Sequence, residues 1–168
     1  NINLKANEAE DSLKKFNFTF MFAPNYHSAM KFVGPARKKM GKKTIFNLIG
    51  PLSSPAQIKR QVVGVFDKKW MKPFAEALRE NGVIHAYIVN SEDGMDEISP
   101  FAKTNVIELK DGMIKEFTID PNALGINASN RENLKGKNAE YNSEKIIEIC
   151  KGINNEFSQS VALNVAAG

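Results

Sequence analysis

The strongest constraint on the fold is a strand, helix and strand pattern in residues 61–90. Residues 61–66 (QVVGVF) form a continuous apolar run, which is typical of a strand that is covered on both faces. Asp67 can cap a helix of regularly spaced apolar residues, and Gly82 can end it. Residues 83–90 (VIHAYIVN) predict the next strand. Because such units pair their strands in parallel, the sequence predicts an α/β fold with helices flanking a mostly parallel sheet.

A second pattern adds an antiparallel element to this sheet. The dipeptide Asp111-Gly112 is a strong signal for a two-residue hairpin turn, and strand-like runs flank it on both sides. The resulting register places Glu108 opposite Lys115, a favourable cross-strand pair. We therefore expect a β-hairpin on an otherwise parallel sheet.

Three further elements are expected outside these patterns. Residues 16–22 are dense in aromatic side chains and predict a buried strand. A helix is expected over residues 28–40, divided or kinked at Pro35. Asn138 can cap a later helix, with Cys150 packed on its apolar side.

Composition narrows the class of protein. A chain of 168 residues can bury the core of one compact domain. Its single cysteine can form neither an internal disulfide nor a cysteine metal cluster, which fits a reducing, cytoplasmic compartment. No apolar run is long enough to cross a bilayer. The net charge of +4 would suit phosphates or nucleic acid, but the basic residues are mostly dispersed and favour a solvated surface.

Two loops are candidates for chemistry, because ligands of open parallel sheets bind outside the carboxyl ends of the strands. Residues 91–97 hold four carboxylates among seven residues, a composition that suits Mg²⁺ but also a solvated acidic loop. Residues 23–27 include His27, which serves as readily in hydrogen bonding as in catalysis. The sequence contains no glycine-rich phosphate motif, nucleophile elbow or zinc spacing.

Residues 20–55 (FMFAPNYHSAMKFVGPARKKMGKKTIFNLIGPLSSP) resemble the anthranilate phosphoribosyltransferase family. The segment GMDEIS at 94–99 resembles the family's metal loop, and NVAA at 164–167 resembles a late helix of the family. The resemblance implies a catalytic domain of the nucleoside phosphorylase and phosphoribosyltransferase type. It also implies that residues 1–168 are a single α/β domain cut at both ends, and that the helical N-terminal domain and the phosphate loop precede it.

The resemblance also implies roles for particular residues. Arg37 falls where the family places the arginine that contacts anthranilate, and its guanidinium suits a carboxylate. Ala23, His27 and Met30 fall on the wall of the same pocket. Asp96 and Glu97 fall on the pair that binds the Mg²⁺ ions holding phosphoribosyl pyrophosphate. The implied reaction joins anthranilate to the ribose and releases pyrophosphate in tryptophan biosynthesis, and no residue is assigned as a general base.

Two alternatives stay open at this point. A pyrimidine nucleoside phosphorylase shares the fold type, although it has no use for an arginine that grips a benzoate. A non-enzymatic relative could bind nucleic acid through basic surface, although the acidic pair argues against it. We expect the full-length protein to be a homodimer without membrane attachment, and the isolated chain to be inactive.

Overall fold

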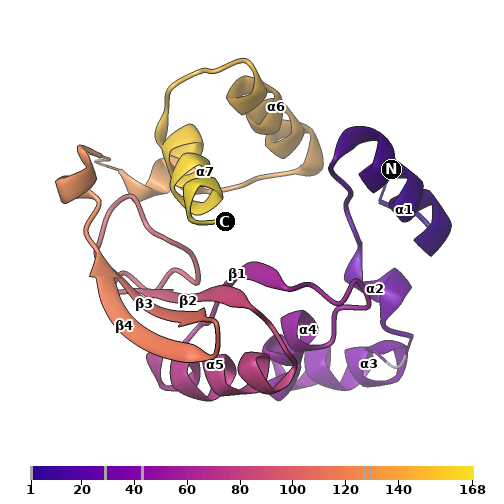
Figure 1. Cartoon of the computed structure of the whole chain (residues 1–168). Coiled ribbons are helices and arrows are strands. Elements are labelled where there is room, and N and C mark those ends of the chain that lie inside the picture. The colour runs from indigo at the N-terminus through magenta and orange to yellow at the C-terminus, as the bar shows by residue number, and fades with distance from the viewer. Residues whose placement is uncertain (1, 29, 43, 127, 129) are drawn as a thin grey trace. The chain divides into compact units, whose positions relative to one another are not determined.

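The computed structural model describes residues 2–28, 30–42, 44–126, 128 and 130–168, and within helix α3 it leaves out the side chains at 30, 31, 37 and 38. The chain forms two compact units, Asn1–Gln57 and Ile58–Gly168 (Figure 1).

The first unit is helical. Asn17 adopts a left-handed conformation and ends helix α1, and the Tyr26 hydroxyl donates to the Leu4 carbonyl at 3.0 Å. The helix expected over residues 28–40 is present as α3, but it begins at Met30 and continues through Pro35 rather than being divided there. The elements of this unit are α1 (Ala6–Phe16), α2 (Ala23–Tyr26), α3 (Met30–Met40), the 3₁₀ turn η1 (Ile45–Asn47) and α4 (Ile49–Leu52).

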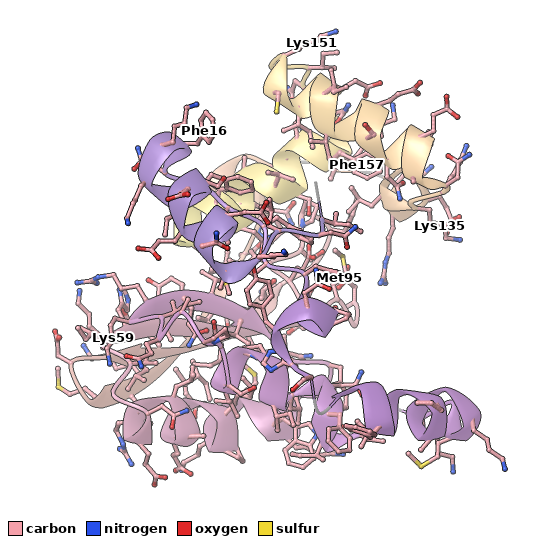
Figure 2. All side chains as sticks on the ribbon, turned by 90° about the vertical axis from the view of Figure 1, so that its right-hand side faces the viewer. Phe16, Lys59, Met95, Lys135, Lys151 and Phe157 are labelled. Carbon is pink, nitrogen blue, oxygen red and sulfur yellow. The ribbon has the colours of Figure 1, made fainter. Side chains whose placement is uncertain are left out.

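The buried strand predicted over residues 16–22 is wrong. Phe16 is the last residue of α1, where it projects from the helix end (Figure 2), and residues 17–22 have no regular secondary structure. Phe16, Phe18 and Phe20 are 65%, 70% and 51% exposed. Aromatic residues favour strands because they pack on a pleated, half-buried surface, and the described residues of this unit offer no sheet for them to join. The expected loop at 23–27 is likewise replaced by the short helix α2.

The second unit is built on a four-stranded sheet. Its strands are β1 (Arg60–Gly64), β2 (His85–Ser91), β3 (Thr104–Lys110) and β4 (Met113–Ile119), in the order β1-β2-β3-β4. The β1–β2 pair is parallel, as the strand, helix and strand pattern predicted, while β2–β3 and β3–β4 are antiparallel. The α/β class is confirmed, but the sheet is mixed rather than mostly parallel because the hairpin of β3 and β4 joins β2 in the antiparallel direction.

The hairpin and its register are confirmed. Glu108 lies opposite Lys115 across β3 and β4, as predicted. Asp111 and Gly112 have φ angles of 49° and 81°, the positive values that a tight hairpin turn requires at both central positions. The sequence therefore contained both the turn and the pairing that follows from it.

Helices lie on both sides of the sheet (Figure 1). Helix α5 (Met71–Glu80) packs on one face with its buried side chains, which are Met71, Phe74, Ala75 and Leu78. The side chain of Asp67 accepts a hydrogen bond from the Lys69 amide and caps the short 3₁₀ turn η2 (Lys68–Trp70) that leads into α5. Gly82 follows the helix with a φ of 71°. The start and end signals read from the sequence are thus confirmed.

Helix α7 (Glu156–Ala167) covers the other face of the sheet. Its Leu163 and Ala167 pack in a core with Val89, Val106 and Ile98. Strand β2 is therefore buried on both faces, which explains its continuous apolar sequence.

Helix α6 (Ala139–Cys150) begins at Asn138, whose side chain caps it by accepting a hydrogen bond from the Tyr141 amide, as predicted. The packing predicted for Cys150 is wrong, because this side chain is exposed near the end of α6. Short 3₁₀ turns, η3 (Asn122–Leu124) and η4 (Arg131–Leu134), complete the unit. Among the residues that the structure describes, every helix is too short or too polar to cross a membrane.

Candidate functional site

The acidic loop begins where β2 ends and closes back on itself. The Ser91 amide donates to the Met95 carbonyl at 2.9 Å, and the Gly94 amide donates to the Ser91 carbonyl at 3.0 Å. Gly94 has a φ of 85°, a backbone angle that residues other than glycine rarely adopt. The loop is therefore a defined turn at the carboxyl end of a parallel strand, the position at which open sheets bind ligands.

Asp93 holds this turn together from inside. Its two carboxylate oxygens accept hydrogen bonds from the Met95 amide at 3.2 Å and the Ser99 hydroxyl at 2.8 Å. Arg131 adds a hydrogen bond to the Asp93 carbonyl at 2.6 Å. Burial opposes ionisation of Asp93, but hydrogen bonds, including those from Ser99 and Met95, outweigh it and lower the pKa of this carboxyl. Asp93 thus shapes the loop, and its lone pairs are largely used within the protein.

Gly64, the last residue of β1, allows the loop to approach the sheet. A Cβ atom at this position would lie 1.4 Å from the carbonyl oxygen of Asp96 and 2.4 Å from its carbonyl carbon. Both are backbone atoms, so no side-chain rotation could relieve the overlap. The sequence offered a signal for this contact, because a glycine inside a strand often marks a close backbone approach.

Asn164 of α7 holds the loop on its other side. The Ile98 amide donates to Asn164 Oδ1 at 3.0 Å, and Asn164 Nδ2 donates to the Ile98 carbonyl at 3.0 Å. Ile98 itself is 1% exposed and belongs to the core beneath α7. The segment that follows the acidic pair is therefore fixed at its backbone.

Asp96 and Glu97 lie on this fixed loop, and each residue as a whole is exposed. Partial burial of the Glu97 carboxyl raises its pKa, and the neighbouring charge of Asp96 raises it further. Within the described residues, no three His, Cys, Asp or Glu side chains gather into a complete protein-only metal site. Two adjacent carboxylates nonetheless fit Mg²⁺, which takes few protein oxygens and completes its shell with water and phosphate.

The residues expected at the anthranilate pocket belong to the first unit, and the acidic pair belongs to the second. Ala23 begins helix α2 and His27 ends it, with the His27 amide donating to the Ala23 carbonyl at 3.0 Å. Met30 and Arg37 lie on helix α3, but their side chains fall outside the described part of the structure. The proposed roles of these four residues therefore stay predictions.

A hollow in the first unit lies beside helix α2, but neither Ala23 nor His27 is among the residues that line it. This cavity of about 450 Å³ is lined by residues 3–6 together with Pro24, Asn25, Tyr26 and Ser28. The side-chain amide of Asn25 donates to the Ile2 carbonyl at 3.3 Å and joins the two walls.

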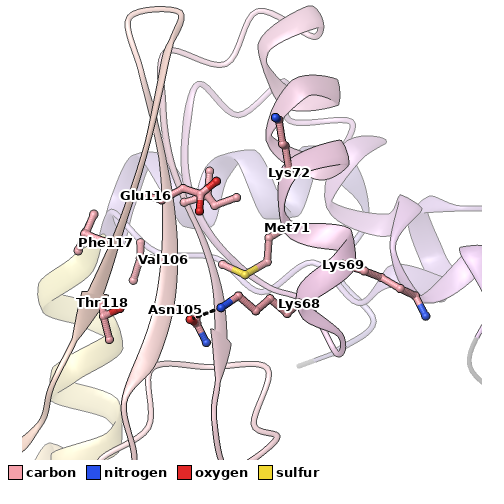
Figure 3. Close-up of a pocket in the computed structure, with 10 residues that line it drawn as sticks. Lys68, Lys69, Met71, Lys72, Asn105, Val106, Glu116, Phe117 and Thr118 are labelled. Atoms are coloured by element: carbon pink, nitrogen blue, oxygen red, sulfur yellow. Dashed lines mark hydrogen bonds between the residues drawn. The ribbon is translucent and has the colours of Figure 1, made fainter.

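A second hollow of about 470 Å³ lies between the start of α5 and strands β3 and β4 (Figure 3). Its lysines do not converge on one point. Lys68 donates to Asn105 Oδ1 at 2.7 Å, Lys69 points away from the hollow and pairs with Asp67 at 2.8 Å, and Lys72 points in a third direction. This part of the basic surface therefore does not form a phosphate cradle.

Comparison with known proteins identifies relatives along nearly the whole chain. The anthranilate phosphoribosyltransferase of Pelagibacter ubique is 60% identical over 167 residues, which are 99% of this chain and 51% of that protein. The Methanosarcina acetivorans enzyme of the same name is 45% identical over 166 residues, which are 45% of its length. The chain thus spans about half the length of the curated relatives it matches.

Solved structures agree with the sequence comparison. Anthranilate phosphoribosyltransferase from Saccharomyces cerevisiae in complex with 4-fluoroanthranilate matches with a TM-score of 0.86 at 25% identity, over 98% of this chain and 48% of that one. The same yeast enzyme in complex with PRPP and Mg matches with a TM-score of 0.85 over the same shares. The family model for the glycosyl transferase family, a/b domain, matches residues 1–168, and this chain therefore belongs to that family, as the resemblance of residues 20–55 predicted.

Proposed function

We propose that this chain forms part of an anthranilate phosphoribosyltransferase. The enzyme would transfer the phosphoribosyl group from phosphoribosyl pyrophosphate to the amine of anthranilate and release pyrophosphate, a step of tryptophan biosynthesis. The observation that carries this proposal is the acidic pair Asp96–Glu97 on a loop fixed at the carboxyl end of β2, in a chain 60% identical to a relative of that name.

Asp96 and Glu97 are the residues that would hold magnesium. Their carboxylates present the hard oxygen ligands that Mg²⁺ prefers, and partial burial together with the charge of Asp96 raises the pKa of Glu97. Bound Mg²⁺ would neutralise negative charge on the pyrophosphate leaving group. The protein's own contribution is to keep both carboxylates in place before the substrate arrives, so that little ordering is required on binding.

The residues that would bind anthranilate belong to the first unit. Arg37 would grip the carboxylate of anthranilate with its planar guanidinium, while Ala23, His27 and Met30 line the path of the ring. Because the aniline nitrogen carries little proton burden, these residues would act by orienting the amine rather than by removing a proton. No general base is assigned among them.

The alternatives are less well supported. The relatives from Pelagibacter ubique and Methanosarcina acetivorans carry the name of the anthranilate enzyme. One yeast structure contains 4-fluoroanthranilate, and a nucleoside phosphorylase has no need of an anthranilate-like ligand. The lysines beside α5 diverge, which disfavours a nucleic-acid surface there. We further propose that the enzyme is a cytoplasmic homodimer and that its phosphate loop and helical domain lie in segments before residue 1.

The test uses an active enzyme that contains this chain. Asp96→Asn combined with Glu97→Gln should abolish Mg²⁺-dependent binding of phosphoribosyl pyrophosphate, measured by calorimetry with and without Mg²⁺, while circular dichroism stays unchanged. Glu92→Gln is the matched control, because it removes an exposed carboxylate from the same loop. Normal metal-dependent binding in the double variant would refute the proposal.

A further inference from the structure

Asn164 makes a contact with the acidic loop that differs from ordinary core packing. One side-chain amide satisfies both backbone groups of Ile98, at 3.0 Å each, across a separation of 66 residues in sequence. The same Nδ2 also donates to the Ser160 carbonyl, one turn earlier in α7, at 2.9 Å. The amide is therefore held against its own helix and cannot turn freely, so it fixes the backbone of Ile98 relative to α7.

The position of Ile98 makes this contact important for the acidic pair. The Ile98 amide belongs to the peptide bond that joins it to Glu97, so fixing this group limits the direction in which the Glu97 side chain leaves the backbone. On the other side, Gly64 lets the Asp96 carbonyl approach β1 so closely that an added Cβ would overlap it. The pair thus sits between two backbone anchors that come from different elements.

Two adjacent carboxylates repel each other when no cation lies between them. A loop without anchors would relax by separating them, and a metal would then have to pull them back together. The hydrogen bonds of Asn164 oppose this relaxation, since swinging the loop outward would leave the buried Ile98 backbone groups without partners.

We propose that Asn164 is a positioning residue for the acidic pair and that it raises the affinity of Asp96 and Glu97 for a divalent cation. This inference rests on the proposed function, because it takes the pair to be the magnesium site. Mutation of residues that hold metal ligands in place commonly lowers metal affinity by about 10- to 100-fold. We expect a change at the lower end of that range, because Asn164 acts through the backbone.

The test compares two variants of helix α7 in the whole chain. Asn164→Ala removes both hydrogen bonds to Ile98. Asn155→Ala is the control: it removes the helix cap, in which the Asn155 side chain accepts from the Ser158 amide at 3.0 Å, and leaves the contact with Ile98 intact. Loss of a cap weakens the helix without reaching the loop. Mg²⁺ alone is titrated into each protein and followed by NMR at the Asp96 and Glu97 amides, and hydrogen exchange is measured at the Ile98 amide.

If the inference holds, Asn164→Ala weakens Mg²⁺ binding about tenfold and speeds exchange of the Ile98 amide, whereas Asn155→Ala retains the wild-type values of both. Wild-type Mg²⁺ affinity in Asn164→Ala would overturn it, as would equal weakening in Asn155→Ala. If the wild-type protein binds no Mg²⁺, the proposed function loses its support. Ile98 exchange then decides separately whether Asn164 positions the loop, and an unchanged rate in Asn164→Ala would overturn the inference.

Discussion

Replacing Gly64 with alanine should destabilise the second unit, although the same substitution usually does the opposite. The φ of Gly64 is not among the positive values, so alanine can adopt its backbone conformation. At such positions Gly→Ala typically stabilises a protein by about 0.4–1 kcal/mol, because it restricts the unfolded chain. Any loss of stability must then come from the contact between the new methyl group and its surroundings.

The structure shows how far the added methyl group would overlap its neighbours. The added Cβ would lie 1.4 Å from the Asp96 carbonyl oxygen, whereas ordinary contacts begin at about 3.4 Å, so the two chain segments must separate by about 2 Å. Such a shift pulls at the hydrogen bonds that Asn164 makes with Ile98. Overpacking typically costs about 1–3 kcal/mol, and we expect about 3 kcal/mol because backbone meets the methyl group directly.

Urea denaturation followed by tryptophan fluorescence measures this loss. Trp70 is the only tryptophan of the chain and directly precedes α5 in the second unit, so its signal reports the unit that contains Gly64. Gly136→Ala is the control, because its added carbon would meet only the end of the exposed Asn142 side chain, at 3.0 Å, and a shift of that side chain by a few tenths of an ångström would relieve the contact. If Gly64→Ala were as stable as the wild type, the close approach of Asp96 to β1 would be refuted.

Three further variants test individual side chains. In an active enzyme containing this chain, Arg37→Ala should weaken the binding of anthranilate by about 2–5 kcal/mol and leave the binding of phosphoribosyl pyrophosphate nearly unchanged. An unchanged KM for anthranilate would contradict the assignment. Glu97→Gln should stabilise the chain at neutral pH, where the raised pKa makes the ionised group costly, and the gain should fade in urea titrations as the pH falls toward 4.5. Asp93→Asn should cost about 1–3 kcal/mol at neutral pH, because the ionised carboxyl accepts hydrogen bonds from the loop. Since the pKa of Asp93 is lowered, the wild-type advantage should persist until the pH falls below 3.8, and an advantage lost near pH 6 would contradict this reasoning.

Elements whose cause is local could be predicted from the sequence. Asp111 and Gly112 carry the backbone preference of a hairpin turn, and the turn sets the register of β3 against β4. Asp67 and Asn138 cap the turns or helices that follow them, because the amides they bind lie two or three residues away. In each case the interacting groups are near neighbours in the chain, so residue type and spacing suffice.

Contacts between distant segments could not be predicted in the same way. The aromatic residues at 16–22 favour a strand, but a strand needs a neighbour, and residue type says nothing about whether one is present. The groups of Ile98 that Asn164 binds are backbone groups, and backbone groups are the same at every position. The resemblance pointed to Asp96 and Glu97, whereas the contacts that Asp93 and Asn164 make with their loop emerged only from the structure.

The link between α7 and the acidic loop has a thermodynamic counterpart. If closing the helix onto Ile98 strengthens binding at the loop, then binding at the loop must strengthen closure of the helix by the same free energy. Occupancy of the site would therefore slow the opening of the helical turns around Asn164, which lies 66 residues beyond Ile98 in the sequence. Leu163 extends this coupling into the core, because it packs against Val89 of β2, the strand from which the loop emerges. The rate at which α7 opens would therefore report whether the loop is occupied.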